Sequence, residues 1–234
     1  MIRFERKKTE KSEKAVESLL KAKNAHSSYN TPDVIAALRE VFHGKCYICE
    51  NKEITSYQIE HLYPHHGNDD LKYDWNNLFL SCAHCNNTKL AKYDPILDCT
   101  KEDIDAVIAF RKTGYFGIEE KLIFQELDSR EETHNTAELL RDIYYGSTPQ
   151  KILEATILRK RLRKELSAFK EYVREYYEAD GEDKDDLRCL IERELEDSSA
   201  FTAFKRWLIK DHKDSFPEFA NILPGICHPK SALH

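Results

Sequence analysis

Hydrophobic residues recur every three to four positions along most of this chain, a pattern typical of amphipathic helices. The first such stretch covers residues 10–26. A second begins at Thr31-Pro32, where a hydroxyl group can cap the helix and proline suits its first turn. The same spacing predicts further helices later in the chain, over residues 133–146, 148–177, 187–195 and 201–208. The sequence therefore predicts a mainly helical protein.

Between these helical stretches the spacing changes to that of β-strands. Residues 54–61 place apolar or β-branched side chains at alternate positions, which predicts a short strand, and residues 77–81 suit its antiparallel partner. Residues 83–93 then predict a short helix that ends at Asp94-Pro95. The connection between the strands, residues 62–76, contains proline, glycine and asparagine and is predicted to be a loop.

The fold class expected from these patterns is α+β and mainly α. A strand–strand–helix unit within residues 45–98 would lie between an N-terminal helical segment, residues 1–44, and a helical C-terminal domain, residues 99–234. Within the last part, residues 100–112 predict a capped helix that stops before Gly114. Residues 115–127 suit one or two short strands.

The composition is that of a soluble globular protein, because 41% of the 234 residues are hydrophobic and 33% are charged. No apolar run approaches the roughly 20 residues that a membrane-spanning helix needs. The N-terminus lacks the apolar segment of a secretory signal. We therefore expect a cytoplasmic protein without a membrane partner, where closely paired cysteines indicate metal binding before disulfides.

The net charge of −6 is unevenly distributed. Residues 1–31 carry eight Lys and Arg against four Glu, whereas residues 178–198 carry ten Asp and Glu against three Lys and Arg. A protein that binds nucleic acid unaided usually presents a clear positive excess to the phosphates. If this chain binds nucleic acid, we expect a partner to share in holding it.

Four cysteines form two Cys-x-x-Cys pairs, Cys46 with Cys49 and Cys82 with Cys85, and 32 residues separate the pairs. The two-residue spacing lets both thiolates of a pair reach one ion, and two pairs complete a tetrahedral set. Because this set leaves no ligand position for water, the predicted Zn²⁺ is structural. The remaining cysteines have no such partner and are expected to be ordinary thiols: Cys99, Cys189 and Cys227.

Polar residues accompany these pairs at defined places. Glu60-His61 ends the first predicted strand, Asn77-Leu78 begins the second, and Asn86 and Lys89 follow the second cysteine pair. Together with the cysteine pairs, these residues resemble the HNH, or ββα-metal, endonucleases. The resemblance extends from Cys46 to Lys89. It implies a nuclease core of two strands and one helix, stabilised by zinc.

The resemblance also implies roles in phosphodiester hydrolysis for individual side chains. His61 would be the general base, since a histidine with a pKa of about 6.5 is largely neutral at cellular pH. Asn77 would hold the neighbouring loop and orient that base. Glu60 and Asn86 would supply oxygen ligands to a catalytic Mg²⁺ (or Mn²⁺), which prefers such ligands. Lys89, one helical turn beyond Asn86, would contact a phosphate.

Two positions depart from the common motif, since Glu60 stands where aspartate is usual and Asn86 where histidine is usual. Both changes affect the choice of metal more than the reaction. Three other histidines are less defined. His65 could bind metal, contact phosphate or be exposed, and His66 is expected to be exposed. His84 is expected to take no part, because the four-cysteine set is already complete.

An HNH core followed by a helical tail, in a chain of this size, resembles the PtuB-type nucleases. These are partners of PtuA-type ATPases in Septu and retron anti-phage systems. In the tail the resemblance depends on residues 136–140 and on the arginine-rich helix that follows. It implies a complex in which a PtuA-like ATPase restrains or presents the nuclease, with DNA as the expected substrate and RNA as the alternative.

Two other functions stay open. A stand-alone HNH enzyme of the restriction or homing type would need its own DNA-recognition module, and the tail shows no basic helix suited to that task. A zinc-stabilised binding module that has lost catalysis would be expected to lack Glu60, His61 or Asn86. All three residues are present.

Overall fold

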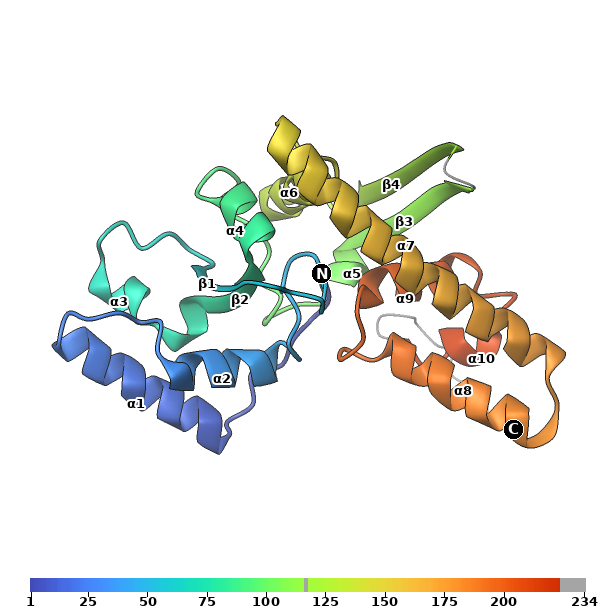
Figure 1. Ribbon diagram of the computed structural model, residues 1–234, viewed down its shortest axis with the longest axis horizontal. Helices are drawn as coiled ribbons and strands as arrows, with labels where there is room; N and C mark the ends of the chain where they lie inside the picture. The colour runs from blue at the N-terminus through green and yellow to red at the C-terminus, as the bar shows by residue number, and fades with distance from the viewer. Residues whose placement is uncertain (116–117, 224–234) are drawn as a thin grey trace.

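The computed structural model describes residues 1–115 and 118–223. Helices predominate and the strands form two small antiparallel sheets, which confirms the predicted α+β, mainly α class. Figure 1 shows α1, α2 and the β1–β2 sheet toward one end of the molecule and α8–α10 toward the other, while the β3–β4 hairpin extends away from the body. No helix in the described ranges is long and apolar enough to cross a membrane.

The chain begins with two helices, α1 (Glu10–Asn24) and α2 (Pro32–Val41), that pack against each other. Each starts where the sequence predicts, because a threonine hydroxyl caps it. The Thr9 side chain accepts a hydrogen bond from the Ser12 amide, and the Thr31 side chain accepts one from the Val34 amide. The loop between these helices reaches the predicted catalytic region, as described below.

The predicted strand–strand–helix unit is present. Strands β1 (Tyr57–His61) and β2 (Leu78–Cys82) pair antiparallel, with His61 opposite Leu78, and β2 leads directly into α4 (Ala83–Lys89). The connection between the strands is more ordered than a simple loop. It contains the short helix α3 (Asp69–Lys72) and the 3₁₀ turn η1 (Trp75–Asn77), each begun by an Asx cap.

The helix predicted over residues 100–112 is wrong. Only a single turn, α5 (Ile104–Val107), is helical, and β3 (Ile108–Tyr115) then pairs antiparallel with β4 (Ile118–Glu126). The tertiary reason is aromatic packing. Phe110 lies opposite Phe124 in the hairpin, and both rings contact Phe204, at 5.4 and 5.8 Å between centroids. These contacts require the alternation of a strand, which short-range periodicity did not reveal.

The C-terminal region is helical as predicted. Helices α6 (Glu131–Tyr145), α7 (Pro149–Glu178), α8 (Gly181–Leu195), α9 (Thr202–Asp211) and α10 (Pro217–Ala220) follow in order. Gly146 ends α6 with a φ of 76°, and a Cβ atom there would lie 2.4 Å from the Ile152 nitrogen, so this tight α6–α7 connection requires glycine. The acidic residues 180–186 lie at the start of α8, which begins earlier than the helix predicted over residues 187–195.

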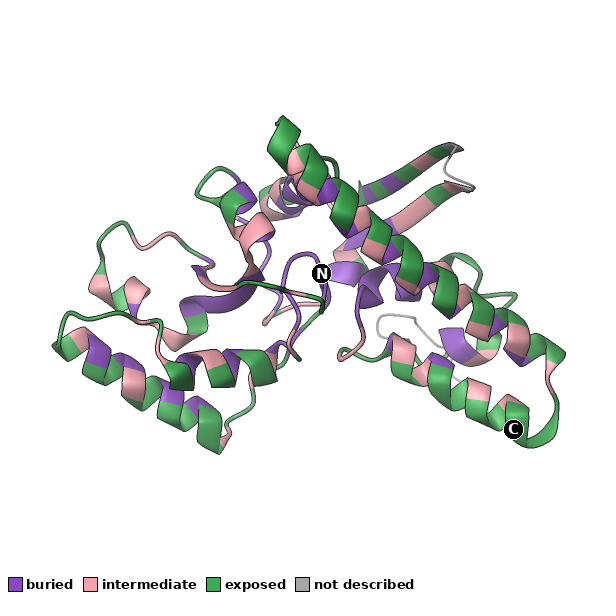
Figure 2. Ribbon diagram, viewed as in Figure 1, coloured by how far each residue is buried: buried purple, intermediate pink, exposed green. Residues whose placement is uncertain are grey.

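Two hydrophobic clusters hold these elements together. The larger extends without interruption from Met1 through the HNH-like segment to the first half of α7 and to Phe204 on α9. The smaller lies between the second half of α7 and helices α8–α10. Figure 2 shows buried residues along the segment that follows the N-terminus, along β2 and on α9, near the middle of the molecule. The core thus crosses the boundary expected at residue 98, and the division into three domains stays a prediction.

A buried carboxylate, that of Glu50, joins distant parts of the chain at the centre of this core. It lies 2.8 Å from the amino nitrogen of Met1 and 3.4 Å from Nζ of Lys45, and it accepts a hydrogen bond from the Ala203 amide. Burial would raise the pKa of Glu50, but the neighbouring cations outweigh it and lower the pKa to about 2. The carboxylate is therefore ionised and fully partnered.

We predict that Glu50→Gln lowers the free energy of unfolding by about 3 kcal/mol, because it leaves buried cations without their counter-ion. Glu53→Gln is the matched control. Its carboxylate pairs with Arg161 at the surface, where such a bridge contributes less than about 0.5 kcal/mol. Urea unfolding at neutral pH, followed by circular dichroism, measures both. Equal effects of the two substitutions would contradict this account of the core.

Candidate active site and cysteine cluster

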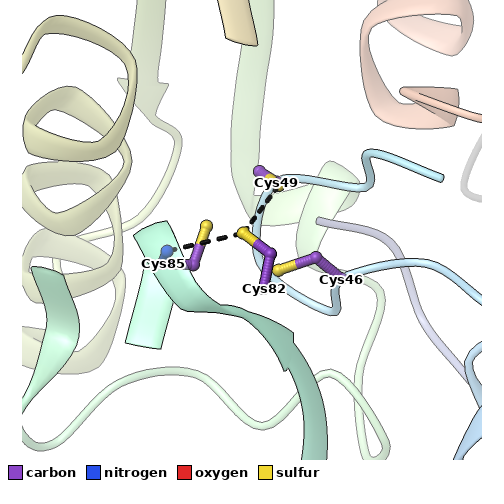
Figure 3. Close-up of side chains that lie close together, drawn as sticks. All are labelled: Cys46, Cys49, Cys82 and Cys85. Carbon is purple, nitrogen blue, oxygen red and sulfur yellow. Dashed lines mark hydrogen bonds between the residues drawn. The ribbon is translucent and has the colours of Figure 1, made fainter. Parts of the chain in front are cut away.

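The four paired cysteines meet at one point. Cys46 and Cys49 come from the segment after α2, Cys82 ends β2, and Cys85 lies in the first turn of α4. Their sulfur atoms all lie within 4.8 Å of one another, and no disulfide joins them. Figure 3 shows the four side chains converging, with Sγ of Cys49 and Sγ of Cys82 4.0 Å apart.

This donor set fits a zinc ion. A tetrahedral Zn²⁺ with Zn–S bonds of about 2.3 Å places its sulfur ligands about 3.8 Å apart, close to the spacing found here. Three of the four cysteines are buried, so the ion would be shielded from solvent. The cluster could therefore bind zinc in the way the sequence predicts. Among the other cysteines, Cys99 is buried and Cys189 is exposed, both as free thiols, and Cys227 lies outside the described residues.

His61, the predicted base, ends β1 and is half-buried. Its Nε2 lies 3.0 Å from the carbonyl oxygen of Lys72, which can only accept a hydrogen bond, so Nε2 carries the proton. The lone pair is then on Nδ1, the nitrogen that could take a proton from water. Burial lowers the pKa of His61 below its usual value of 6.5, which favours this neutral form.

Two other rings enclose the imidazole of His61. The ring of Tyr29, from the loop between α1 and α2, contacts it edge to face at 4.8 Å between centroids. The ring of His65, from the loop after β1, contacts it at the same distance. The site is therefore assembled partly from the N-terminal helical segment. Sequence reasoning did not single out Tyr29, because nothing in its local sequence marks it.

Asn77 ends η1 directly before β2, and it is buried. Its Oδ1 accepts a hydrogen bond from the Tyr63 amide at 2.8 Å, and its Nδ2 donates to the carbonyls of Tyr63 and Leu71 at 2.9 and 3.0 Å. The Asn77 side chain thus connects both ends of the loop that presents the Lys72 carbonyl to His61. This placement agrees with the predicted task of holding the loop and orienting the base.

Glu60 faces away from His61, because successive side chains of a strand point to opposite sides. Its carboxylate is buried, where it accepts a hydrogen bond from the Tyr47 hydroxyl at 2.6 Å and pairs with Nζ of Lys89 at 2.8 Å. Burial raises the pKa of Glu60 to about 7, although Lys89 acts in the opposite direction. Both oxygens of the predicted metal ligand are therefore occupied by protein groups.

Lys89 is placed differently from the phosphate contact that the motif predicts. Its side chain is only 1% exposed, and Nζ donates hydrogen bonds to the carbonyls of His61 and Leu62 at 3.2 and 3.0 Å. The same ammonium group pairs with Glu60 and, at 3.3 Å, with Asp94. In this position Lys89 supports the end of β1 from within the core, and it presents no charge to a phosphate at the surface.

Asn86 is the predicted metal ligand that remains available. It follows Cys85 on α4, a helix that packs against β1, and its side chain is half-buried. Within residues 1–115 and 118–223 its amide group makes no hydrogen bond to protein. An asparagine with a free oxygen at this position fits a ligand for a hard cation.

The remaining histidines, His66 and His84, differ in their exposure and in their contacts. His66 is exposed, in agreement with the prediction. His84 is not an idle residue of the knuckle, because its Nδ1 lies 2.8 Å from the Glu154 carboxylate and its Nε2 lies 2.8 Å from the Ile143 carbonyl. It therefore connects α4, and with it the cysteine cluster, to α6 and α7. The sequence did not reveal this contact because its partners are 59 and 70 residues away.

Comparisons with known proteins agree with the strand–strand–helix unit and the cysteine cluster described above. Residues 46–92 match the family model described as HNH endonuclease, a class of hydrolytic nucleases. This confirms the resemblance that the sequence motif predicts, over the segment that carries the cysteine cluster, β1, β2 and α4.

Part of this chain is also similar in sequence to two individual proteins. The Septu protein PtuB of Bacillus thuringiensis is 32% identical over 83 residues, which cover 33% of this chain and 32% of that protein. The Septu protein PtuB of Bacillus mycoides (strain KBAB4) is 36% identical over 84 residues, which cover 30% of this chain and 28% of that protein. The chain thus spans about a third of the length of these relatives.

We predict that Lys89→Met lowers the free energy of unfolding by about 3 kcal/mol, because it removes the buried ammonium group that joins the His61 and Leu62 carbonyls to Glu60 and Asp94. The double variant Glu60→Gln/Lys89→Met should lose clearly less than the sum of the two single variants, since the groups act on each other. Chemical unfolding of all three variants measures this coupling. A Lys89→Met protein with wild-type stability but weakened nucleic-acid binding would instead support the phosphate contact.

We predict one zinc ion per chain, measured by mass spectrometry of the intact native protein. Cys85→Ser should lose the ion and several kcal/mol of stability, because metal binding contributes directly to folding in such sites. Cys189→Ser changes an exposed thiol outside the cluster, so this variant should keep both the zinc ion and the wild-type stability. Purified protein without metal but with wild-type thermal stability would contradict a structural zinc site.

Proposed function

We propose that this protein is a metal-dependent HNH endonuclease that hydrolyses phosphodiester bonds of nucleic acid. The observation that supports this most directly is the tautomer of His61. The Lys72 carbonyl holds the proton on Nε2, so the basic Nδ1 is available at a half-buried position. A general base needs this combination of a defined lone pair and a neutral ring.

In the proposed reaction, Nδ1 of His61 removes a proton from a water molecule as the water oxygen bonds to phosphorus. The bond between phosphorus and the 3′ oxygen breaks, and this oxygen takes a proton from solvent. His61 afterwards releases its proton to solvent. Asn77 contributes as a positioning residue, since it holds the loop that carries the Lys72 carbonyl. Tyr29 restricts the rotation of the imidazole through its edge-to-face contact.

A hard divalent cation, Mg²⁺ (or Mn²⁺), would neutralise phosphate charge in such a reaction. Asn86 fits this cation as an oxygen donor. Glu60 in its present position does not, because Tyr47 and Lys89 occupy its carboxylate. We therefore assign Asn86 as the candidate ligand. Glu60 serves the site indirectly, by compensating the charge of the Lys89 ammonium group that supports the end of β1.

We propose a separate, structural role for zinc at the cysteine cluster. The ion would join the segment after α2 to the junction of β2 and α4, where Asn86 lies one residue beyond Cys85. The contacts of His84 then extend this rigid unit to α6 and α7. Zinc would thereby support the nuclease site without taking part in the reaction.

The similarity to Septu PtuB proteins supports a place in anti-phage defence, with an ATPase as partner. The charge distribution agrees with such a division of labour, since the net charge of −6 favours a partner that shares in binding the substrate. We accordingly propose a cytoplasmic effector nuclease. DNA is the proposed substrate, and RNA is the alternative, because contacts to phosphates do not distinguish them.

We predict that the wild-type protein cuts nucleic acid in the presence of Mg²⁺ and that His61→Ala reduces the rate at least about 100-fold, since general base catalysis contributes about this much. The control is His66→Asn, an exposed neighbour for which asparagine suits the positive φ of 43°. Supercoiled plasmid and total RNA are offered separately, with Mg²⁺ or with EDTA, and the fragments are resolved by gel electrophoresis.

The assay is repeated with the ATPase partner co-expressed, to include an activity that depends on the complex. Cleavage that survives EDTA would contradict metal dependence, and cleavage that survives His61→Ala would contradict the role of the base. A zinc-loaded, folded protein that cuts neither substrate, alone or in the complex, would contradict the nuclease.

A further inference from the structure

The burial of Lys89 leaves the proposed nuclease without the protein donor that the motif supplies to the phosphate. A scissile phosphate gains negative charge on its oxygens in the transition state, and preorganised hydrogen-bond donors stabilise that charge. The Lys89 ammonium group is directed to three backbone carbonyls and two carboxylates. Another donor beside His61 would therefore be needed for this task.

His65 has the properties of such a donor. The Gly67 amide donates a hydrogen bond to its Nδ1 at 3.1 Å, so in the neutral ring the proton is on Nε2. In the described part of the chain, Nε2 of His65 has no hydrogen-bond partner. The ring is half-buried, and its centroid lies 4.8 Å from that of His61. An oriented N–H group without a partner thus lies directly beside the base.

The backbone around His65 fixes this orientation. Residues His65–Asn68 form a tight turn, in which the Asn68 amide donates to the His65 carbonyl at 2.7 Å. The two central residues both have positive φ, 43° for His66 and 83° for Gly67, as in a type I′ turn. Histidine is among the non-glycine residues that adopt this conformation most often, and glycine adopts it readily, so the sequence is compatible with the turn. The turn places the Gly67 amide against Nδ1 of His65.

Simple distances favour a contact between His65 and substrate. The water that His61 deprotonates must lie about 2.6–3.2 Å from Nδ1, and the reacting phosphorus about 3–3.5 Å from that water. Oxygens of the scissile phosphate would then lie within a few ångström of the His61 ring, the range in which the His65 ring is found. Tyr29 also contacts the ring of His61. Within the described residues, however, its hydroxyl group makes no hydrogen bond that would fix its orientation.

We propose, on the basis of the nuclease function inferred above, that His65 is a second catalytic residue. Its Nε2–H donates a hydrogen bond to a non-bridging oxygen of the scissile phosphate, and this bond strengthens as negative charge develops. No proton is transferred and no covalent bond to His65 forms. His65 thereby supplies the hydrogen-bond donor that the motif assigns to Lys89, whose ammonium group is bonded within the core.

Two substitutions separate donation from packing. His65→Phe keeps a ring against His61 and removes the N–H group, whereas His65→Gln keeps an N–H donor and removes the ring. We expect His65→Phe to lower kcat about 100-fold, the effect of removing one donor to a developing charge, with KM changed less than about threefold. His65→Gln should recover at least a tenth of wild-type kcat. The exposed neighbour variant His66→Asn is the control.

The kinetic outcomes decide whether His65 donates a hydrogen bond to the phosphate or only packs against His61. High activity of His65→Phe with low activity of His65→Gln would mean that the ring only packs against His61, and it would overturn the proposal. Nearly wild-type activity of both variants would overturn it as well. If the wild-type protein binds and cuts no nucleic acid, the proposed nuclease function itself fails, which is a different result from active protein with an unimportant His65.

A measurement without turnover provides a second test. Long-range ¹H–¹⁵N NMR spectra of the folded wild-type protein should show His65 protonated at Nε2 and unprotonated at Nδ1. A phosphorothioate-linked oligothymidine, added in EDTA so that nothing is cut, should shift the Nε2 signal of His65 more than that of His66. An unshifted His65 signal, while other signals report a bound oligonucleotide, would overturn the proposal.

Discussion

A buried ammonium group holds the centre of the proposed nuclease site. Lys89, at the end of α4, donates hydrogen bonds to the carbonyls of His61 and Leu62 and pairs with Glu60 and Asp94. These contacts connect α4 to the end of β1, where His61 is the last residue of the strand. Because an unpaired charge in the core is strongly unfavourable, the ammonium group and its partners must form together. The position of His61 depends on this cluster.

The rest of the site is built outward from that cluster by parts of the chain that are distant in sequence. The Lys72 carbonyl sets the tautomer of His61, and Asn77 holds the loop that presents this carbonyl. Tyr29 reaches the same histidine from the N-terminal helices. On the far side, His84 connects the cysteine cluster to α6 and α7. Specific side-chain contacts therefore join the helical region to the HNH-like segment.

Motif residues in this structure divide into those with a polar group available for binding and those that serve the fold. Among the described residues, nothing donates to Nδ1 of His61 and nothing bonds to the amide group of Asn86. Glu60 and Lys89 neutralise each other in the core. Their presence in the motif is explained as well by support of the strand end as by contact with metal or phosphate. For that reason stability and catalysis should be measured separately for these residues.

The sequence alone determined the elements with strong local signals. Helical periodicity predicted α1, α2, α6 and α7, and paired cysteines around a short alternating segment predicted the strand–strand–helix unit and its cysteine cluster. Only the tertiary structure decided that residues 108–115 form a strand, that Lys89 is buried, and that Tyr29 and His65 flank His61. The physical reason is common to all three. Local patterns encode caps, turns and periodicity, whereas burial and ring contacts depend on which distant segments meet.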